Sequence, residues 1–244
     1  MDEHSLQSPY VFKFFKQALK PSKKKTYFYS EIEELREKHI SNTRLEINKI
    51  QGSGSSMGNK AKNISVIASK GISTRKKSEL LLNIINELQS ENVLELGTSL
   101  GINTLYLSKG NKVAGVKTIE GSVLLAGLAQ KNFALCKVKS IELYEEDIQA
   151  VLSLFRENNL KFDFVFVDAN HTYEATVEYY LELLKITTKE AVVVFDDINW
   201  SDGMTKAWNQ ISQHTSNNLT IENHQLGIVF LGSELENRNY VLNF

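Results

Sequence analysis

Residues 92–108, which read NVLELGTSLGINTLYLS, constrain the fold more than any other stretch of the chain. Residues 93–96 form a short, mostly apolar run of the kind found in strands that are buried on both faces. Gly97 follows at once, and residues 102–106 carry apolar side chains at helical spacing. The stretch therefore predicts a strand, a tight glycine turn and a helix. In α/β sheets, ligands bind beside such turns at the carboxyl ends of the strands.

The spacing of the glycines narrows the choice of ligand. The turn reads E-x-G-x-x-x-G, with Glu95 two residues before Gly97 and Gly101 four residues after it. A dinucleotide fingerprint needs G-x-G-x-x-G so that the backbone can close on a pyrophosphate, and the middle glycine is missing here. A carboxylate at this position would repel a pyrophosphate but suits a cationic ligand. We expect Thr98 and Ser99 to cap the following helix, and the alternative is a plain turn with glycines for tight packing.

The composition excludes several classes of protein. The chain has 244 residues, of which 42% are hydrophobic and 23% charged, as in an ordinary globular protein with one α/β domain and an extension. No apolar run approaches the ~20 residues of a transmembrane helix, and the N-terminus lacks the features of a signal peptide. Cys136 is the only cysteine, which excludes an internal disulfide and a cysteine-based zinc site. These features predict a cytoplasmic protein with no membrane segment.

The net charge of -1 conceals an asymmetry along the chain. Residues 1–77 hold 16 Lys and Arg against 7 Asp and Glu, whereas the remainder holds 12 basic and 22 acidic residues. A basic arm beside an acidic body indicates either a surface for nucleic acid or an arm that docks on the body. The scattered placement of the basic residues favours docking.

The segment before the glycine turn predicts a helical extension. Ser8 and Pro9 are typical of a helix start, and Ser30 with Glu33 resembles a capping box. Two short amphipathic helices cannot hold a core of their own, so we expect them to pack on the main domain or to mediate a homodimer.

Residues 51–59, QGSGSSMGN, predict a flexible linker or a lid over the active site. A phosphate loop is disfavoured because no lysine followed by serine or threonine appears in the P-loop pattern. We place the domain boundary after this segment, between residues 76 and 77, with residues 1–76 as the extension and lid and residues 77–244 as the main domain.

Strand and helix patterns alternate after the central strand. The expected strands cover residues 113–119, 140–143, 162–167 and 191–195, and the expected helices cover residues 122–133, 148–155, 172–184 and 201–211. Such alternation predicts a parallel sheet. The chain then ends in three short strands over residues 219–222, 226–231 and 240–242, which predict at least one antiparallel strand at an edge.

An acidic residue ends or follows each of the five alternating strands. These residues are Glu95, Glu120, Asp147, Asp168, Asp196 and Asp197. Because parallel strands share one carboxyl edge, we expect the six carboxylates near one another. A single acid after a strand means little, since Asp also caps helices, and Asp147 could simply cap the helix that begins at Ile148.

Together, the glycine turn and the segments VFVDANHTYE and FDDINW resemble the class I S-adenosylmethionine (SAM) methyltransferases over about residues 77–244. In detail they are similar to the small-molecule, catechol-type O-methyltransferases. The chain as a whole, including HSLQSPYVFKFF near the start and FDDINWSDGMTKAW near the end, is similar to a bacterial group of class I methyltransferases of unassigned substrate. The resemblance implies an α/β fold with a Rossmann-like, doubly wound, mostly parallel seven-stranded sheet, an antiparallel edge strand and an N-terminal helical extension.

The resemblance also implies residues that hold SAM. Glu95 would face the methionine amino group, directly or through water, while Gly97 lets the backbone approach the cofactor and Gly101 packs the helix against the sheet. Thr98 and Ser99 complete this turn.

At the adenosine end, Glu120 beside Gly121 would accept hydrogen bonds from the ribose hydroxyls, as an acid in that place does in dinucleotide folds. Asp147 would accept from the adenine amino group, and Ile148 would pack on the ring.

The remaining acids raise the question of a metal. Cation-dependent enzymes of the resembled family place an aspartate after the fourth strand and an Asp-Asn pair after the fifth, and hard oxygen ligands suit Mg²⁺. Asp168 and Asp196 match this pattern, whereas Asp197 stands where the family has asparagine. His171 lies three positions after Asp168, where the family carries a lysine that helps to deprotonate the acceptor, and histidine is a suitable general base.

These observations predict a SAM-dependent methyltransferase that acts on a hydroxyl of a small molecule, with Asp168 and His171 as catalytic residues. Three alternatives stay open. One is an RNA methyltransferase that uses the basic N-terminal region, and another is a non-catalytic module that binds SAM. The third is a nicotinamide oxidoreductase of related topology, which the missing glycine disfavours.

Overall fold

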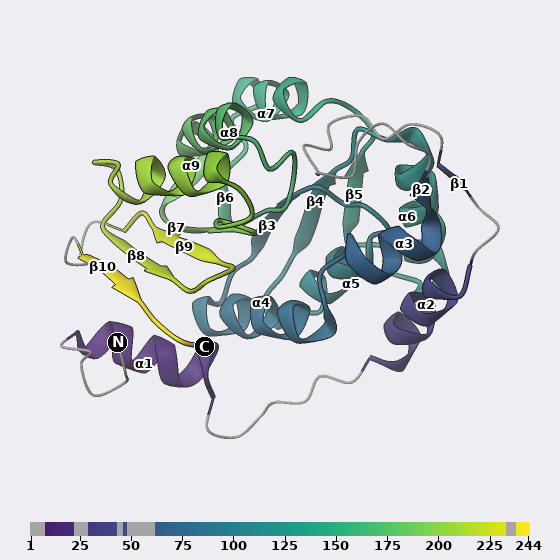
Figure 1. The fold of residues 1–244 in the computed structure, drawn as a ribbon, viewed down its shortest axis with the longest axis horizontal. Helices are drawn as coiled ribbons and strands as arrows, with labels where there is room; N and C mark the ends of the chain where they lie inside the picture. The colour runs from purple at the N-terminus through teal and green to yellow at the C-terminus, as the bar shows by residue number, and fades with distance from the viewer. Residues whose placement is uncertain (1–7, 22–28, 43–45, 48–61, 233–237) are drawn as a thin grey trace.

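The computed structural model describes residues 8–21, 29–42, 46–47, 62–232 and 238–244. Eight strands form its main sheet: β3 (Asn92–Leu96), β4 (Gly115–Ile119), β5 (Ile141–Tyr144), β6 (Phe162–Val167), β7 (Thr187–Phe195), β8 (Leu219–Glu222), β9 (Gly227–Phe230) and β10 (Arg238–Val241). Their order across the sheet is β10-β8-β9-β7-β6-β3-β4-β5 (Figure 1). A separate antiparallel pair joins β1 (Glu46–Ile47) to β2 (Lys62–Asn63).

The mostly parallel, Rossmann-like sheet is confirmed, and β3 lies inside it between β6 and β4. The antiparallel strand is β9, which pairs with β7 and β8 and lies third from one edge. The expectation of seven strands is wrong, because the C-terminal strand β10 pairs in parallel with β8 and adds an eighth.

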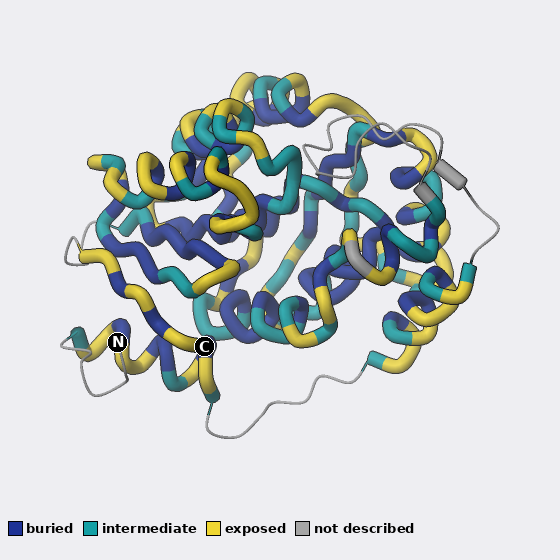
Figure 2. Tube along the Cα trace, in the orientation of Figure 1, coloured by how far each residue is buried: buried dark blue, intermediate teal, exposed yellow. Residues whose placement is uncertain are grey.

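Helices cover both faces of the sheet (Figure 1). The bounds are α4 (Arg75–Leu88), α5 (Ile102–Leu107), α6 (Val123–Leu135), α7 (Ile148–Glu157), α8 (Tyr173–Ile186) and α9 (Asp202–Ser212). Successive strand residues point to opposite faces, so Val93 packs in the cluster that holds α4, whereas Leu94 packs in the cluster that holds α7, α8 and α9. The central strands are correspondingly the most buried part of the chain (Figure 2).

The first helix starts as its sequence predicts. In α1 (Pro9–Phe14) the side chain of Ser8 accepts a hydrogen bond from the backbone N–H of Val11 at 3.4 Å. A π-helical turn, η2 (Phe15–Leu19), continues it and packs on α4. Phe14 meets Phe230 of β9 edge to face, with ring centroids 5.1 Å apart. The first helix therefore shares the core of the main sheet.

The second helix, α2 (Ser30–Ile40), begins differently from the prediction. Its N-cap is Tyr29, so Ser30 lies inside the helix and the expected capping box is wrong. Glu33 instead accepts hydrogen bonds from Arg36 and from the hydroxyl of Tyr106 in α5. The helix α3 (Ile64–Lys70) packs beside α2, and both join a third apolar cluster with α5 and α6.

The glycine- and serine-rich segment 51–59 lies outside the described residues. Within the ranges that the structure does describe, every helix is too short or too polar to cross a membrane.

Candidate functional site

Two glycines shape the turn between β3 and α5. Gly97 has φ +97°, and a Cβ atom there would overlap the carbonyl oxygen of Asp168. Gly101 has φ +72°, and a Cβ atom there would overlap the ring of Phe133 in α6. Left-handed backbone and close approach both favour glycine. Gly97 thus brings the turn against the end of β6, while Gly101 allows α5 to approach α6 and not the sheet as expected.

Thr98 and Ser99 do not cap α5, because Gly101 is the N-cap residue and carries no side chain to do so. The hydroxyl of Thr98 instead lies 2.6 Å from that of Thr118 on β4. Ser99 has φ +50°, and its backbone N–H donates to the carboxylate of Glu120 at 2.8 Å. The turn is therefore fixed to β4 and to the acid that follows it.

Four of the seven described non-glycine residues with positive φ lie at the same edge of the sheet. Ser99 follows β3, Asn170 (φ +63°) and His171 (φ +40°) follow β6, and Asp197 (φ +52°) follows β7. Such conformations cost free energy and cluster at functional sites. Their placement marks the carboxyl edge as the candidate site.

Glu95 is 1% exposed and points into the protein. Its oxygens accept hydrogen bonds from the amide of Asn103 at 2.8 Å and from the hydroxyls of Thr104 and Thr118 at 2.5 and 2.7 Å. Burial raises the pKa of Glu95 to about 7, although these three donors oppose the shift. The buried carboxylate of Glu95 on β3 therefore links β3 to α5 and to β4 through these hydrogen bonds.

This burial predicts a pH dependence of stability. The pKa of Glu95 rises from 4.5 to about 7 on folding, so the unfolded chain releases its proton first and wild-type stability falls as pH rises between those values. Glu95→Gln cannot titrate, so the wild type should lose on the order of 3 kcal/mol of unfolding free energy relative to the variant between pH 4.5 and 8. Urea unfolding of both proteins measures this, and parallel pH profiles would contradict the buried, raised-pKa carboxyl.

Glu120 ends β4 and is 8% exposed. One oxygen accepts from Ser99 N–H at 2.8 Å and the other from Ser122 N–H at 2.9 Å. Burial raises the pKa of Glu120, and the two N–H donors limit the rise. Each carboxylate oxygen can accept a second hydrogen bond, so Glu120 can also bind two hydroxyls of a ligand. Gly121 beside it has room for a side chain.

Asp147 caps α7, as its alternative interpretation proposes. Its Oδ1 accepts from the backbone N–H groups of Gln149 and Ala150 at 2.9 and 3.3 Å. The residue is exposed, while Ile148 is buried in the cluster between the sheet and α7 to α9. An exposed, fixed carboxylate at this edge can still accept a hydrogen bond from a ligand.

Asp168 and His171 lie together after β6. His171 Nε2 is 3.4 Å from Asp168 Oδ1, and both side chains are partly exposed. Burial lowers the pKa of His171, but the hydrogen bond and the charge of Asp168 outweigh it, so the pKa is raised above 6.5. The pair has the geometry of a histidine base held by a carboxylate.

Asp196 binds a lysine that the sequence interpretation missed. The residue is 2% exposed, and Lys77 Nζ lies 2.8 Å from its Oδ1 and 2.6 Å from its Oδ2. Burial favours the neutral form of Lys77, but contact with Asp196 outweighs it and raises the pKa of the lysine. The sequence hid this pair because Lys77 is 119 residues away and belongs to a basic run, residues 75–77, that reads as a solvated helix start.

The expected divalent metal site does not fit this arrangement. An ammonium already bridges both oxygens of Asp196, and Asp197 Oδ1 lies 3.4 Å from the side-chain nitrogen of Gln225. In the part of the chain that the structure describes, no group of three His, Cys, Asp or Glu side chains is arranged to hold a metal ion. Asp168, Asp196 and Asp197 do share one edge, but the positive charge beside them belongs to the chain.

Known proteins share both the domain and the fold. Residues 94–198, which hold the glycine turn, Glu120, Asp168 and Asp196, match the family described as a methyltransferase domain. This stretch of the chain is similar to a methyltransferase domain. A comparison with curated protein sequences finds no match.

Three solved structures are similar to this chain in fold. An O-methyltransferase from Bacillus cereus in complex with SAH (S-adenosylhomocysteine) is 18% identical, with a TM-score of 0.63 over 91% of this chain and 97% of that one. The SAH-bound methyltransferase PaMTH1 from Podospora anserina is 15% identical, with a TM-score of 0.63 over 92% and 96%. The SAM-bound O-methyltransferase TomG from Streptomyces achromogenes is 20% identical, with a TM-score of 0.58 over 66% and 82%. At these identities the likeness establishes the fold.

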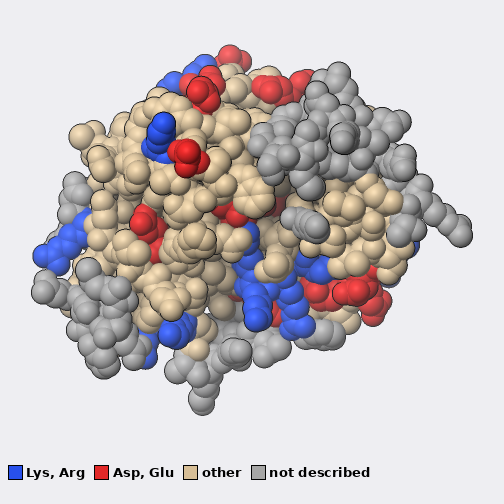
Figure 3. Space-filling model, in the orientation of Figure 1, with Lys and Arg blue, Asp and Glu red and all other residues tan. Residues whose placement is uncertain are grey.

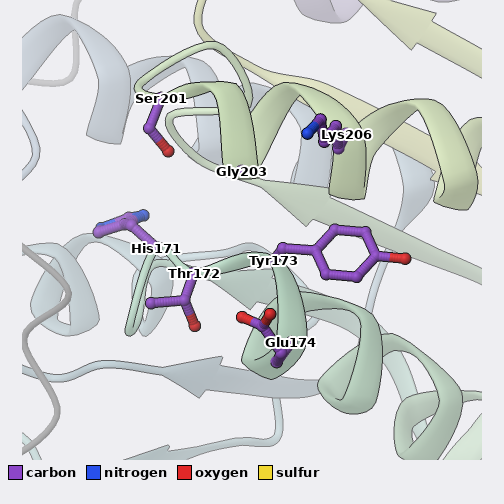
Figure 4. A pocket seen from close by; sticks show the side chains of 7 residues that line it. All are labelled: His171, Thr172, Tyr173, Glu174, Ser201, Gly203 and Lys206. Carbon is purple, nitrogen blue, oxygen red and sulfur yellow. The ribbon is translucent and has the colours of Figure 1, made fainter.

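A pocket of about 580 Å³ opens between α8 and α9 (Figure 4). It is lined by His171, Tyr173 and Glu174 at the start of α8 and by Ser201, Gly203 and Lys206 of the α9 region. His171 and Ser201 lie at one end of it (Figure 4). His171 therefore belongs both to the pocket and to the carboxylate edge.

Proposed function

We propose that this methyltransferase binds SAM at the carboxyl edge of β3 and β4 and transfers the methyl group to an oxygen of a small molecule. One observation carries the proposal: the glycine turn closes on the acid that ends β4, through the 2.8 Å hydrogen bond from Ser99 N–H to Glu120. A turn with a glycine at each end, beside a buried carboxylate, suits a ligand that has hydroxyls and a positive charge but no pyrophosphate.

Different residues along this edge bind different parts of SAM. Glu120 accepts the ribose hydroxyls, and Gly97 lets the turn lie against the end of β6, where the cofactor passes. Asp147 accepts from the adenine amino group, with Ile148 beneath the ring. Glu95 interacts with the ammonium group of the methionine part of SAM indirectly. Asn103 and Thr104, which donate hydrogen bonds to Glu95, lie between them. A cation there favours the ionised form of Glu95 and so offsets the cost of its burial.

The pocket and the histidine support transfer to oxygen. Bound SAM would supply a methyl group on a positively charged sulfur. The chain must align an acceptor with that carbon and remove a proton from it, and alignment alone supplies about 7–11 kcal/mol in favourable cases. His171, held by Asp168, removes the proton of a hydroxyl group that reaches it from the pocket between α8 and α9. A pocket of this size suits a small molecule.

The choice of oxygen also agrees with the similar structures from Bacillus cereus and Streptomyces achromogenes, both described as O-methyltransferases. A small-molecule acceptor is also what the sequence resemblance to the catechol-type enzymes implies.

Glu120→Gln tests the proposal. The amide keeps one acceptor oxygen but loses the charge and the second acceptor, so SAM affinity should fall about 10- to 100-fold, the effect of one or two hydrogen bonds to a charged group. Calorimetric titration with SAM measures this. Glu157→Gln, at the exposed end of α7, is the matched control and should bind like the wild type. A folded Glu120→Gln variant with wild-type affinity would contradict the ribose-binding role.

A further inference from the structure

Lys77 connects the first turn of α4 to the carboxyl edge of the sheet. Its backbone N–H donates to the N-cap residue Thr74 at 3.3 Å, which fixes the helix start from which the side chain leaves. Its ammonium meets both oxygens of Asp196 at the end of β7, and the Lys77 side chain is only 10% exposed. Figure 3 shows Lys and Arg side chains gathered over α4 on this face of the molecule.

The ammonium faces a cluster of three carboxylates. Asp168, Asp196 and Asp197 each interact electrostatically with Lys77, and the same three interact with His171. Carboxylates that converge on one point repel each other unless a positive charge lies between them. Here that charge is covalently attached to the chain. A lysine ammonium has three N–H donors, and Asp196 accepts from this one at both of its oxygens.

We propose that the Lys77 ammonium takes the place that a divalent cation has in cation-dependent O-methyltransferases: it neutralises the aspartate cluster and offers its third N–H to the acceptor oxygen. The inference rests on the proposed function. His171 accepts the hydroxyl proton as the oxygen–carbon bond forms and the carbon–sulfur bond breaks, which leaves a neutral ether and a neutral thioether. Lys77 stabilises the negative charge that develops on the oxygen, so the reaction needs no divalent metal.

Binding of Mn²⁺ tests whether the Lys77 ammonium occupies the place of a divalent cation, and this test does not require catalytic turnover. Lys77→Met keeps the length of the side chain but removes its charge, and Lys76→Met is the matched control at the exposed neighbouring position. Titration followed by electron paramagnetic resonance should show no Mn²⁺ site in the wild type or in Lys76→Met. Lys77→Met should bind Mn²⁺ at least about tenfold more tightly than the wild type, because a positive charge has left Asp196 and the two carboxylates that interact with it electrostatically.

Two further results test whether Lys77 excludes a divalent cation if Lys77→Met does not fold. Lys77→Arg retains the charge and should exclude Mn²⁺ as the wild type does. A wild-type chain that binds one Mn²⁺, and loses it in Asp168→Asn, would overturn the proposal. Calorimetry with SAM on the same proteins tests the proposed function separately. A chain that excludes Mn²⁺ but does not bind SAM would refute the proposed function, while the Lys77 ammonium would still stand in place of a divalent cation.

The rate of methyl transfer to a catechol tests whether Lys77 donates a hydrogen bond to the acceptor oxygen. Wild-type turnover should be unchanged by EDTA, whereas Lys77→Met should lose turnover at least about tenfold, as expected when a charged donor to the reacting oxygen is removed, and regain part of it with Mn²⁺. Turnover by Lys77→Met at the wild-type rate, with EDTA present, would overturn this role.

Discussion

His171→Ala should lower the turnover of methyl transfer by about 10²- to 10⁴-fold, the range typical for loss of a general base. The imidazole is the group at the edge of the pocket that can take a proton near neutral pH, and Asp168 holds it at 3.4 Å. SAM affinity should stay within about twofold of the wild type, because base catalysis acts on the transition state and not on cofactor binding.

The measurement is the rate of SAH formation with an acceptor chosen from a panel of phenols and catechols. His224→Ala, at an exposed position before β9, serves as the control and should behave like the wild type. Equal rates for His171→Ala and the wild type would remove His171 from the mechanism.

The pH profile gives an independent view of the same residue. A base works in its neutral form, so turnover should rise with pH through the pKa of His171, which Asp168 raises above 6.5. Asp168→Asn removes that charge, and the acid limb of the profile should move to lower pH. A limb that does not move would show that another group controls the rate.

Gly97→Val should abolish detectable SAM binding, a loss of more than about 100-fold, since the side chain meets both a steric and a conformational barrier. At φ +97° a valine is strained, and its Cβ would overlap the Asp168 carbonyl oxygen. The backbone must then move away from β6, and the turn loses the shape that admits the cofactor.

Loss of folding could imitate this result, so binding is measured below the melting temperature of the variant, which circular dichroism determines. Gly127→Ala is the matched control, because a Cβ atom at that position in α6 meets nothing within 4 Å. It should bind SAM normally and unfold at the same or a higher temperature, since alanine favours helix over glycine. Undiminished SAM binding by Gly97→Val would contradict the assignment of the turn.

Local patterns predicted the parts of the fold that local physics controls. The apolar run of β3, the glycines after it and the alternation of strands with helices lie within short windows of sequence. The placement of Glu120, Asp168 and Asp196 at one edge of the sheet follows from parallel topology. The start of α1 at Ser8 also followed from its own cap.

Contacts between distant residues controlled what the sequence did not predict. Glu33 binds Tyr106 instead of closing a capping box, and Lys77 crosses to Asp196, because tertiary partners outweigh local preference. The sequence predicted the carboxylate cluster, and a metal ion was expected to neutralise it. Lys77 was not identified as the neutralising group, because a lysine at a helix start resembles any exposed lysine. The eighth strand depends on the pairing of β10 with β8, which only the folded sheet defines.

The proposed function depends on SAM binding by the turn after β3. Calorimetric titration of the wild-type protein measures this binding, with NAD as the comparison ligand and EDTA present throughout. We expect one SAM bound per chain and no heat from NAD. Binding of NAD without SAM would contradict the proposed function, and so would heat from neither ligand, which would leave residues 95–101 as a tight turn between a strand and a helix.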